Sequence, residues 1–348
     1  MPKGCLPLLA ALALAIGAGM VTAVRSSPPL GLLVGLGLFV WGVWFFFWVP
    51  HRLGQRPLRA LLLPLGLGKG VGELARRLGM TPPEVRAFRC RYREAFIPKR
   101  RGGTRRLLVP DDATLALQRR ILHRLLGRLR AHPAAHAYER GRSVATNAAP
   151  HAGRAVVIKL DLVDFFPRTS AARVEHYFRR IGWSRSAARL LAGLTTFEGG
   201  LPQGAPTSPR LSNLVNGQLD RLIERYVRKH RGTYTRYADD LTISYPEDWP
   251  RYVRGTLQVV RRVAASQGYR VHGRPKLGIW RRHQRQVVTG IVVNERPDLP
   301  RAKLRWLRAV EHRLRTTGRA SLSPSQLAGW RAYRAMVRAS GGAPPPGE

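Results

Sequence analysis

Two long apolar runs without a charged residue open the chain, Leu6–Val24 and Leu30–Val49. Each is close to the roughly 20 residues that a membrane-spanning helix needs. The segment Arg25–Pro29, which ends in a Pro-Pro pair, predicts a turn between them. Tryptophan and phenylalanine gather at the end of the second run and Arg52 follows, a pattern typical of the cytoplasmic boundary of a membrane. We therefore expect a two-helix transmembrane hairpin over residues 1–52, multi-pass membrane localisation and a cytoplasmic body.

The first run alone also fits a cleaved signal peptide, because Lys3 precedes it and small residues end it. In that case the second run would still cross the membrane toward the cytoplasm, and the body of the chain would keep the same location.

Beyond this leader, stretches with helical periodicity are mixed with short β-prone runs, which indicates an α+β protein. The expected elements are a helical linker over 53–91, two extended runs around a Gly-Gly turn within Phe96–Pro110, a helix over Thr114–Arg130, a buried strand over Val156–Leu162, a hairpin over Thr233–Tyr245, strands at Arg270–His272 and Val287–Val293, and a basic helix over Arg301–Arg315. The Gly- and Pro-rich end of the sequence, from Gly341, predicts a disordered tail.

The charge of the chain indicates that it binds a polyanion. Lys and Arg total 60 residues against 20 Asp and Glu, so the formal net charge is +40. A GC-rich coding bias explains why only seven of the 60 basic residues are Lys, but it does not explain the scarcity of acids. We therefore expect a nucleic-acid partner. The two cysteines, Cys5 and Cys90, are too few for a disulfide framework or a zinc site.

Three aspartates stand where strands are expected to end. Asp161 closes the buried strand, and Asp239 and Asp240 lie at the tip of the hairpin. An Asp-Asp pair in a hairpin is usually only a turn. Together with Asp161, however, the pair offers the oxygen ligands that two Mg2+ ions need for phosphoryl transfer from a nucleoside triphosphate. We expect Asp161 and Asp239 to bridge both ions, with Asp240 and the carbonyl of Leu162 completing the ligand set.

Five motifs in this order resemble those of retron-type bacterial reverse transcriptases. Tyr237-Ala-Asp-Asp240 resembles the YxDD box, Lys159–Pro167 the motif of the first carboxylate, and Leu201–Pro209 the nucleotide-site motif. Asn147–His151 matches NAxxH and Val288–Gly290 matches VTG, two stretches typical of retron enzymes. Each short motif is weak alone, but five in the order of the family are specific.

The resemblance covers about 92–315 and implies a right-hand polymerase fold. Fingers are expected over about 92–155, a ferredoxin-like palm over about 156–294 and a helical thumb from about 295, followed by a C-terminal helix and the disordered tail within 316–348. The two transmembrane helices would precede this body. The implied activity is that of an RNA-directed DNA polymerase with two Mg2+ ions as cofactors.

The resemblance also assigns contacts with the incoming nucleotide. The residues concerned are Lys99, Arg105, Phe166, Gln203, Gly204 and Tyr237. Lys99 and Arg105 would clamp the triphosphate, unless they are two ordinary charges of a basic surface. Phe166 would lie under the sugar and exclude a 2′ hydroxyl, while Phe165 is expected to be an ordinary core residue. Gly204 would let the backbone approach the nucleotide closely, although a plain Pro-Gly turn is the simpler interpretation.

Five further residues carry more open expectations. Lys276 falls where the family keeps a lysine near the leaving pyrophosphate, so it is a candidate general acid, with a solvated lysine as the alternative. Asn147 and His151 would contact template RNA or brace the fingers. Thr289 and Gly290 would shape the connection to a thumb that grips RNA.

The implied reaction copies a cognate structured noncoding RNA, which supplies template and primer, from dNTPs into a branched RNA–DNA product used in antiphage defence. No acidic cluster for a ribonuclease H domain follows Asp240, so we expect a host ribonuclease H to remove the template. Membrane lipid would be a further partner. Two alternatives remain open: an intron-encoded or diversity-generating reverse transcriptase, and a catalytically silent RNA-binding scaffold with a membrane effector hairpin.

Overall fold

The computed structural model describes residues 68–98, 102–273 and 276–342, and the described residues from Lys69 onward belong to one compact unit. The expected transmembrane hairpin, Lys99 and the expected disordered tail from residue 343 lie outside the described residues. No helix in the described part of the chain combines the length and apolar character needed to cross a bilayer.

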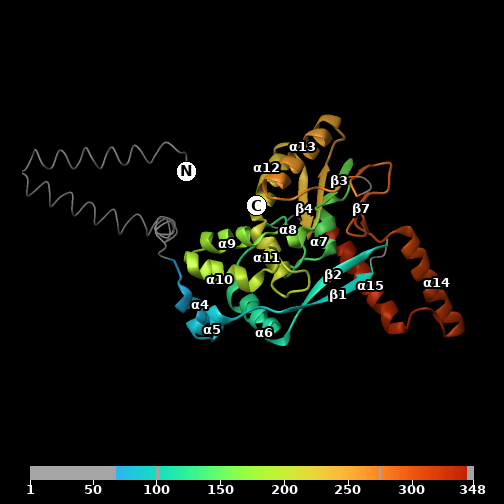
Figure 1. The fold of residues 1–348 in the computed structure, drawn as a ribbon. Coiled ribbons are helices and arrows are strands. Elements are labelled where there is room, and N and C mark those ends of the chain that lie inside the picture. Colours follow the sequence, from blue (N-terminus) through green and yellow to red (C-terminus); the bar gives the residue numbers. More distant parts are fainter. Residues whose placement is uncertain (1–67, 99–101, 274–275, 343–348) are drawn as a thin grey trace, which may run out of the picture. The chain divides into compact units, whose positions relative to one another are not determined.

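The described part of this unit contains helices and three small sheets (Figure 1). The helices within the described ranges are α4 (Val71–Leu78), α5 (Pro82–Ala87), α6 (Asp112–Ile121), the π-helical turn η1 (Leu122–Leu126), α7 (Val144–Ala148), the 3-10 turn η2 (Ala149–His151), α8 (Phe165–Arg168), α9 (Ala171–Arg180), α10 (Arg185–Thr195), α11 (Ser208–Val215), α12 (Gly217–Lys229), α13 (Pro250–Ser266), α14 (Arg301–Thr317), α15 (Pro324–Ala339) and the 3-10 turn η3 (Ser340–Gly342). The strands are β1 (Tyr92–Pro98), β2 (Thr104–Pro110), β3 (Val156–Asp161), β4 (Thr233–Tyr237), β5 (Asp240–Tyr245), β6 (Gly278–Arg281), β7 (Val287–Val288) and β8 (Ile291–Val292).

The central sheet has four strands in the order β4-β5-β3-β6, and all neighbours are antiparallel. Helices separate β3 from β4 and β5 from β6, so the element sequence is β-α-β-β-α-β, which is the ferredoxin-like arrangement. The expected ferredoxin-like palm is therefore confirmed as a sheet topology.

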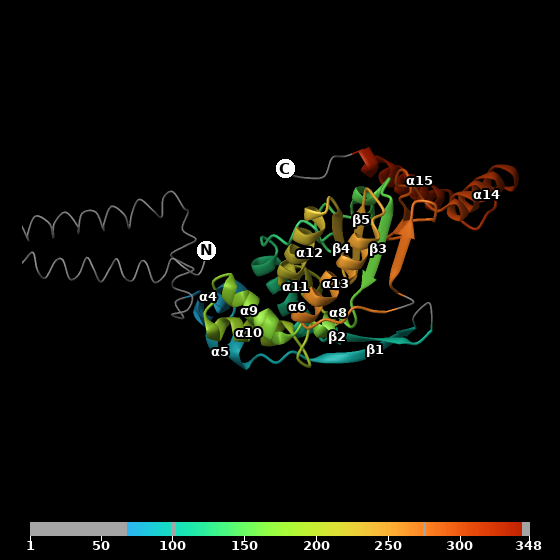
Figure 2. The ribbon, with the colours of Figure 1, turned by 90° about the horizontal axis from the view of Figure 1, so that it is seen from above.

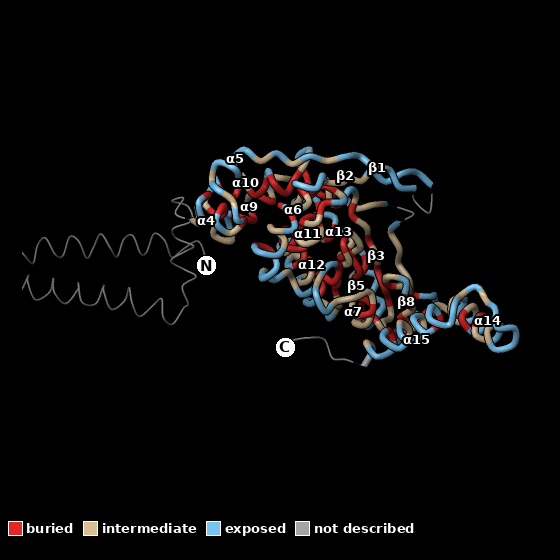
Figure 3. Tube along the Cα trace, turned by 90° about the horizontal axis from the view of Figure 1, so that it is seen from below, coloured by how far each residue is buried: buried red, intermediate tan, exposed pale blue. Residues whose placement is uncertain are grey.

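Side chains along β3 point alternately to the two faces of the palm sheet. Val156, Ile158 and Leu160 pack against the apolar sides of α12 and α13, which cover one face of the sheet (Figure 1). The intervening positions, including Asp161, point to the other face. Figure 3 shows β3 as buried along most of its length, whereas β1 is largely exposed. The sheet is thus a rigid support that presents Asp161 at its end.

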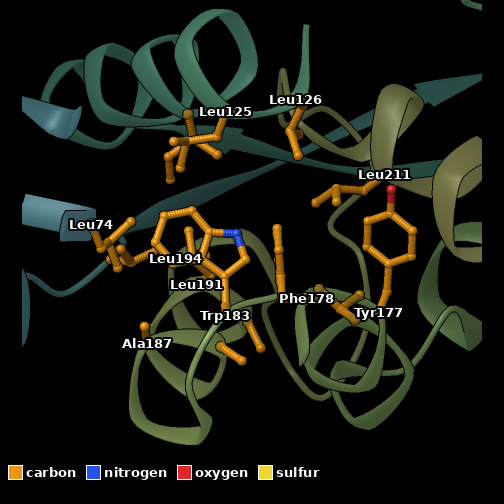
Figure 4. Packing of buried hydrophobic residues seen from close by; sticks show 14 of the residues in the cluster. Leu74, Leu125, Leu126, Tyr177, Phe178, Trp183, Ala187, Leu191, Leu194 and Leu211 are labelled. Atoms are coloured by element: carbon orange, nitrogen blue, oxygen red, sulfur yellow. The ribbon is translucent and has the colours of Figure 1, made fainter. Parts of the chain in front are cut away.

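A second hydrophobic cluster lies among the helices α4, α6, α9, α10 and α11, where Leu74, Phe178, Trp183 and Leu191 interlock (Figure 4). The two-stranded β1–β2 hairpin extends from this helical region, as the Gly-Gly pattern in the sequence predicts. The range expected for the fingers, about 92–155, contains β1, β2 and α6 of these elements, whereas α4 lies in the expected helical linker and α9, α10 and α11 lie in the range expected for the palm.

The range expected for the thumb contains α14, and α15 lies where the separate C-terminal helix is expected. The two helices lie next to each other (Figure 2). Leu307 and Val310 of α14 pack against Leu327 of α15. Near its end, α15 contributes Val337 to a separate cluster that includes Val157 of β3. The end of α15 therefore packs against the face of the palm sheet to which Asp161 also points.

Three sequence expectations need correction. Val287–Val293 is not one strand but two short strands, because Thr289 (φ 47°) and Gly290 (φ 85°) are both left-handed and reverse the chain. Arg270–His272 is not a strand, since Val271 makes only an isolated bridge with Leu162 while β6 occupies the place beside β3. The helix expected over Thr114–Arg130 begins at Asp112 and changes to a π-helical turn at Leu122.

Candidate active site

The three aspartates meet at one end of the palm sheet. Asp161, the last residue of β3, pairs directly with Asp240, the first residue of β5, so their side chains share one face. Asp239 and Ala238 form the two-residue loop between β4 and β5, and Ala238 is left-handed with φ 58°. The backbone N–H of Leu162 donates to the carbonyl of Asp239 at 3.1 Å, which joins the strand end to the loop. Residues about eighty positions apart in sequence are thus brought together as the motif pattern predicts.

Partial burial and mutual repulsion make this site a poor place for negative charge alone. The pKa of Asp239 is raised to about 6, first by burial and then by the charges of Asp161 and Asp240. Burial also raises the pKa of Asp240, although the charge of Lys159 opposes the shift. A desolvated group of carboxylates is stabilised by a cation, and their oxygens are the ligands that Mg2+ prefers.

The donor set therefore fits magnesium in its chemistry. Within the described ranges, no three or more His, Cys, Asp or Glu side chains converge into a preformed metal cluster. The expected ligands are those available at this end of the sheet: the side chains of Asp161, Asp239 and Asp240, together with the carbonyl of Leu162, next to Asp161 in the chain.

A lysine already neutralises part of this charge. Lys276 Nζ donates to Asp161 Oδ1 at 2.8 Å, and His272 Nε2 lies 3.3 Å from the same oxygen. His272 is held beside Asp161 because its backbone N–H donates to the carbonyl of Asp161 at 2.8 Å. The Lys276 side chain is ion-paired although it is 46% exposed, and its action as a general acid stays a prediction.

A buried ionic network lies next to the two-residue loop Ala238–Asp239, the catalytic loop, and none of the sequence motifs identifies it. The guanidinium of Arg236 donates to both oxygens of Asp220, at 2.7 Å each, and both side chains are fully buried. The hydroxyl of Tyr234 donates to the same carboxylate at 2.8 Å. Another nitrogen of Arg236 donates to the carbonyl of Ala238 and to Asn213 Oδ1, both at 3.1 Å. The network thus holds the left-handed residue of the loop, and its one sequence signal is an arginine within an otherwise uncharged strand.

The loop that follows Leu201 connects the fingers hairpin to the palm. The N–H of Leu108 in β2 donates to the carbonyl of Gln203 at 2.8 Å, and the N–H of Leu201 donates to the carbonyl of Phe166 at 3.1 Å. Gly204 has φ 126°, and a Cβ there would lie 2.7 Å from the carbonyl oxygen of Leu108. Gly204 is therefore required by a close approach of two backbones, and the interpretation as a plain turn is incomplete.

The paired phenylalanines differ as the sequence predicts. Phe165 is 4% exposed, and its ring stacks on Tyr269 with centroids 5.7 Å apart, which confirms it as a core residue. Phe166 is half-buried, and its centroid lies 6.3 Å from that of Tyr138. Tyr237 is also half-buried and pairs with Asp240 across the hairpin. The proposed contacts of Phe166 and Tyr237 with a nucleotide stay predictions.

Of the two candidates for the triphosphate clamp, Arg105 belongs to the described residues and Lys99 does not. Arg105 is exposed on β2, where it pairs with Ile97 across the hairpin. Lys99 lies outside the described residues. The clamp therefore stays a prediction.

The expectation that Asn147 and His151 contact RNA is wrong for this structure, because both are fully buried. His151 forms hydrogen bonds with Ser244 of β5 at 2.7 Å and with Thr235 of β4 at 2.8 Å. Burial lowers the pKa of His151 to about 3, so the ring is neutral at physiological pH. The residue braces two palm strands rather than the fingers.

Thr289 and Gly290 form the turn between β7 and β8. The hydroxyl of Thr289 donates to the carbonyl of Val144 at 3.0 Å, which ties this turn to α7. Gly290 is exposed. The pair shapes the segment that leads into the thumb helices, and contact with RNA stays a prediction.

Comparisons with known proteins agree with this geometry. Residues 97–274 match the family model described as reverse transcriptase (RNA-dependent DNA polymerase). The retron Mx65 reverse transcriptase of Myxococcus xanthus is 38% identical over 294 residues, which cover 78% of this chain and 66% of the relative. The retron Mx162 reverse transcriptase of the same organism is 35% identical over 333 residues, which cover 84% and 68%.

The chain spans about two thirds of the length of these relatives. Among solved structures, a telomerase of Candida tropicalis that lacks its C-terminal domain superposes with a TM-score of 0.44 at 13% identity, over 60% of this chain and 55% of the telomerase. On the family match and the retron relatives, the chain belongs to the retron-type reverse transcriptases, which are RNA-directed DNA polymerases.

Proposed function

We propose that this chain copies a structured noncoding RNA into DNA by magnesium-assisted nucleotidyl transfer. The observation that carries the proposal is the placement of three carboxylates, Asp161, Asp239 and Asp240, on adjacent antiparallel strands where burial and repulsion favour a cation. Two bound Mg2+ ions would activate the attacking hydroxyl and neutralise the leaving pyrophosphate.

The chain's own residues bind and orient the substrates. Arg105 offers an exposed guanidinium to the triphosphate from the fingers hairpin. Phe166 lies half-buried between the helical cluster and the palm core, which suits a rigid wall beneath the sugar that excludes a 2′ hydroxyl. Gly204 lets the loop backbone approach β2 closely, which joins the fingers hairpin to the palm.

The proposed product is a branched RNA–DNA molecule in which synthesis starts from a 2′ hydroxyl of the RNA itself. Support comes from the retron names of the relatives and from the NAxxH and VTG motifs. A host ribonuclease H would remove the copied template, and antiphage defence is the proposed biological role.

Sequencing the nucleic acid that copurifies with the full-length protein tests this function. The expected result is one RNA species joined to a complementary DNA through a 2′–5′ linkage, absent from an Asp161→Asn preparation. Linear DNA copied equally well from unrelated primed RNAs would favour an intron-encoded or diversity-generating enzyme. Bound RNA with no DNA, and no synthesis with Mg2+, would favour a silent scaffold.

We also propose that residues 1–52 anchor the protein in a membrane, on the basis of the two apolar runs and the arginines after them. Deleting these residues should move the protein from the membrane fraction to the soluble fraction and leave nucleotide incorporation intact. A full-length protein that fractionates as soluble would contradict this proposal without affecting the polymerase.

A further inference from the structure

One aromatic residue beside the carboxylates has an unusual backbone conformation. Tyr138, in the segment before α7, has φ 62°, which is rare for a bulky side chain. Its side chain is 50% exposed, and it belongs to none of the four hydrophobic clusters of the described residues. An unfavourable conformation that contributes nothing to a core points to a functional reason for it.

The surrounding side chains hold this conformation in place. The amide nitrogen of buried Asn213 donates to the carbonyl of Ala137 at 2.6 Å and to Glu139 Oε1 at 2.9 Å, so both neighbours of Tyr138 are fixed. The amide oxygen of Asn213 accepts from Arg236 at 3.1 Å. The Tyr138 backbone is therefore connected, through two buried side chains, to the network that holds the catalytic loop.

The ring lies among residues that the proposed function assigns to nucleotide binding. Its centroid is 6.3 Å from that of Phe166, with the planes tilted by 50°. The pKa of the Tyr138 phenol is raised, first by partial burial and then by the charges of Asp239 and Tyr237, while the charge of Arg105 lowers it. Tyr138 is therefore within electrostatic reach of both the catalytic loop and the fingers strand.

We propose that the exposed ring of Tyr138 forms, together with Phe166, an aromatic wall of the nucleotide pocket that packs against the incoming dNTP. The inference rests on the proposed function, because the occupant is a dNTP only if the site polymerises DNA. A rigid aromatic ring gives a large contact area for a base or sugar. The ring lies beside Phe166 and outside the hydrophobic clusters of the described residues, so it is available for such a contact.

Kinetics of dTTP incorporation on poly(rA) primed with oligo(dT) test the assignment in the full-length protein. Two variants remove the ring and tolerate a left-handed backbone, Tyr138→Asn and Tyr138→Gly. Both should raise the KM for dTTP about tenfold, the loss expected when one aromatic contact with a base is removed, while kcat stays within about threefold. Tyr138→Phe, which keeps the ring, should leave the KM within about twofold of wild type.

Trp249 supplies a matched control. It is 45% exposed and lies beyond the end of β5 that is remote from Asp240, so Trp249→Ala should leave the KM for dTTP unchanged. Binding of primed poly(rA) without nucleotide, followed by fluorescence anisotropy, should be the same in all variants. Melting temperatures of the Asn and Gly variants close to that of wild type would show that the fold is retained.

An unchanged KM in both ring-less variants would overturn the role of Tyr138. So would weaker binding of primed RNA with an unchanged KM, because the ring would then serve the RNA. Either outcome leaves the proposed function intact as long as the wild-type protein incorporates dTTP. A wild-type protein that incorporates no deoxynucleotide on primed poly(rA) or on the RNA that copurifies with it would overturn both.

Discussion

At the scale of single residues, the site stores repulsion between carboxylates. Because the pKa of Asp239 is raised to about 6, the folded state binds this proton more tightly than the unfolded state does. Stability contributed by the protonated group is therefore lost as the pH rises through about 6. At neutral pH and without metal, ionised Asp239 opposes folding.

We predict that Asp239→Asn abolishes nucleotide incorporation but raises the melting temperature in metal-free buffer at neutral pH, by about 2–4 °C. The amide keeps the shape of the side chain and removes the charge. Thermal scans with a chelator, compared with primer extension in Mg2+, measure both effects. A variant that melts below wild type, or that retains a tenth of the wild-type extension activity, would contradict the prediction.

Phe166 and Phe165 offer a matched pair for testing sugar selection. Phe166→Val should increase the use of ribonucleotides relative to deoxynucleotides, because a smaller side chain leaves room for the 2′ hydroxyl. Phe165→Leu, which disturbs the stacked contact with Tyr269, should lower the melting temperature and leave the nucleotide ratio unchanged. The ratio is measured by single-nucleotide incorporation, and equal ratios in wild type and Phe166→Val would exclude Phe166 as the gate.

The sequence predicts residues whose chemistry is read from local motifs and misses those defined by distant partners. Asp161 and Asp239 are found because metal chemistry requires carboxylates at strand ends. Arg236 contacts Asp220 16 positions away, and Asn213 reaches Ala137 76 positions away, so no local pattern identifies these partners. The RNA contact expected of His151 is wrong for the same reason, because the motif contains no information on burial.

At the scale of elements, alternation predicts a strand well but not where it reverses. The β4–β5 hairpin was predictable because β-prone runs flank a short polar loop. The run Val287–Val293 has the same apolar character on both sides of Thr289–Gly290, so it resembles one strand. Only the two left-handed residues distinguish the hairpin from a continuous strand.

The contact between the fingers hairpin and the palm loop is an element-scale feature with a sharp test. A methyl group at Gly204 would lie 2.7 Å from the carbonyl oxygen of Leu108, and its φ of 126° is unfavourable for alanine. We predict that Gly204→Ala displaces β2 from the loop, so that it lowers both the melting temperature and nucleotide incorporation. Both are measured on the same preparation.

Gly268 is the matched control, because its φ is 79° and nothing lies within 4 Å of a Cβ there. Gly268→Ala therefore introduces only the conformational penalty of a left-handed alanine, about 1 kcal/mol, without a steric contact. Incorporation should be normal in this variant. Equal loss of activity in both variants would mean that backbone strain, and not the approach to β2, explains the effect of Gly204→Ala.

At the scale of the whole molecule, two buried histidines make stability depend on pH. Burial lowers the pKa of both His136 and His151 to about 3 from an ordinary value of 6.5. Between these values the unfolded state binds more protons than the folded state, so stability decreases as the pH falls. Below about pH 6, protonation of Asp239 raises stability as the pH falls. The dependence of the melting temperature on pH must therefore be compared between proteins that both contain Asp239.

We predict that the melting temperature of the wild-type protein decreases from pH 7 to pH 5 more steeply than that of His151→Asn. The variant is expected to be less stable at pH 7, because it cannot bridge Ser244 and Thr235 as the ring does. The pH slope, and not the absolute melting temperature, is therefore the relevant measurement. Parallel slopes would contradict a neutral, buried His151.

Net charge indicates only the class of partner that the whole molecule binds. A charge of +40 predicts a polyanionic partner, but it does not show which part of the surface that partner contacts. The placement comes from the tertiary contacts that bring the fingers hairpin, the palm sheet and the thumb helices together. The α+β class and the sheet topology follow from the order of the elements, whereas their contacts depend on packing that no local pattern contains.

Heating reduces the penalty for burying Arg236 and Asp220, because the hydration of charged groups becomes less favourable as the temperature rises. The apolar contacts of the palm gain no comparable advantage. The catalytic loop is therefore fastened by an interaction whose net contribution grows on warming, while the helical and palm clusters set the temperature of global unfolding. We therefore expect thermal inactivation of the enzyme to coincide with the melting of its cores rather than with an earlier loosening of the catalytic loop.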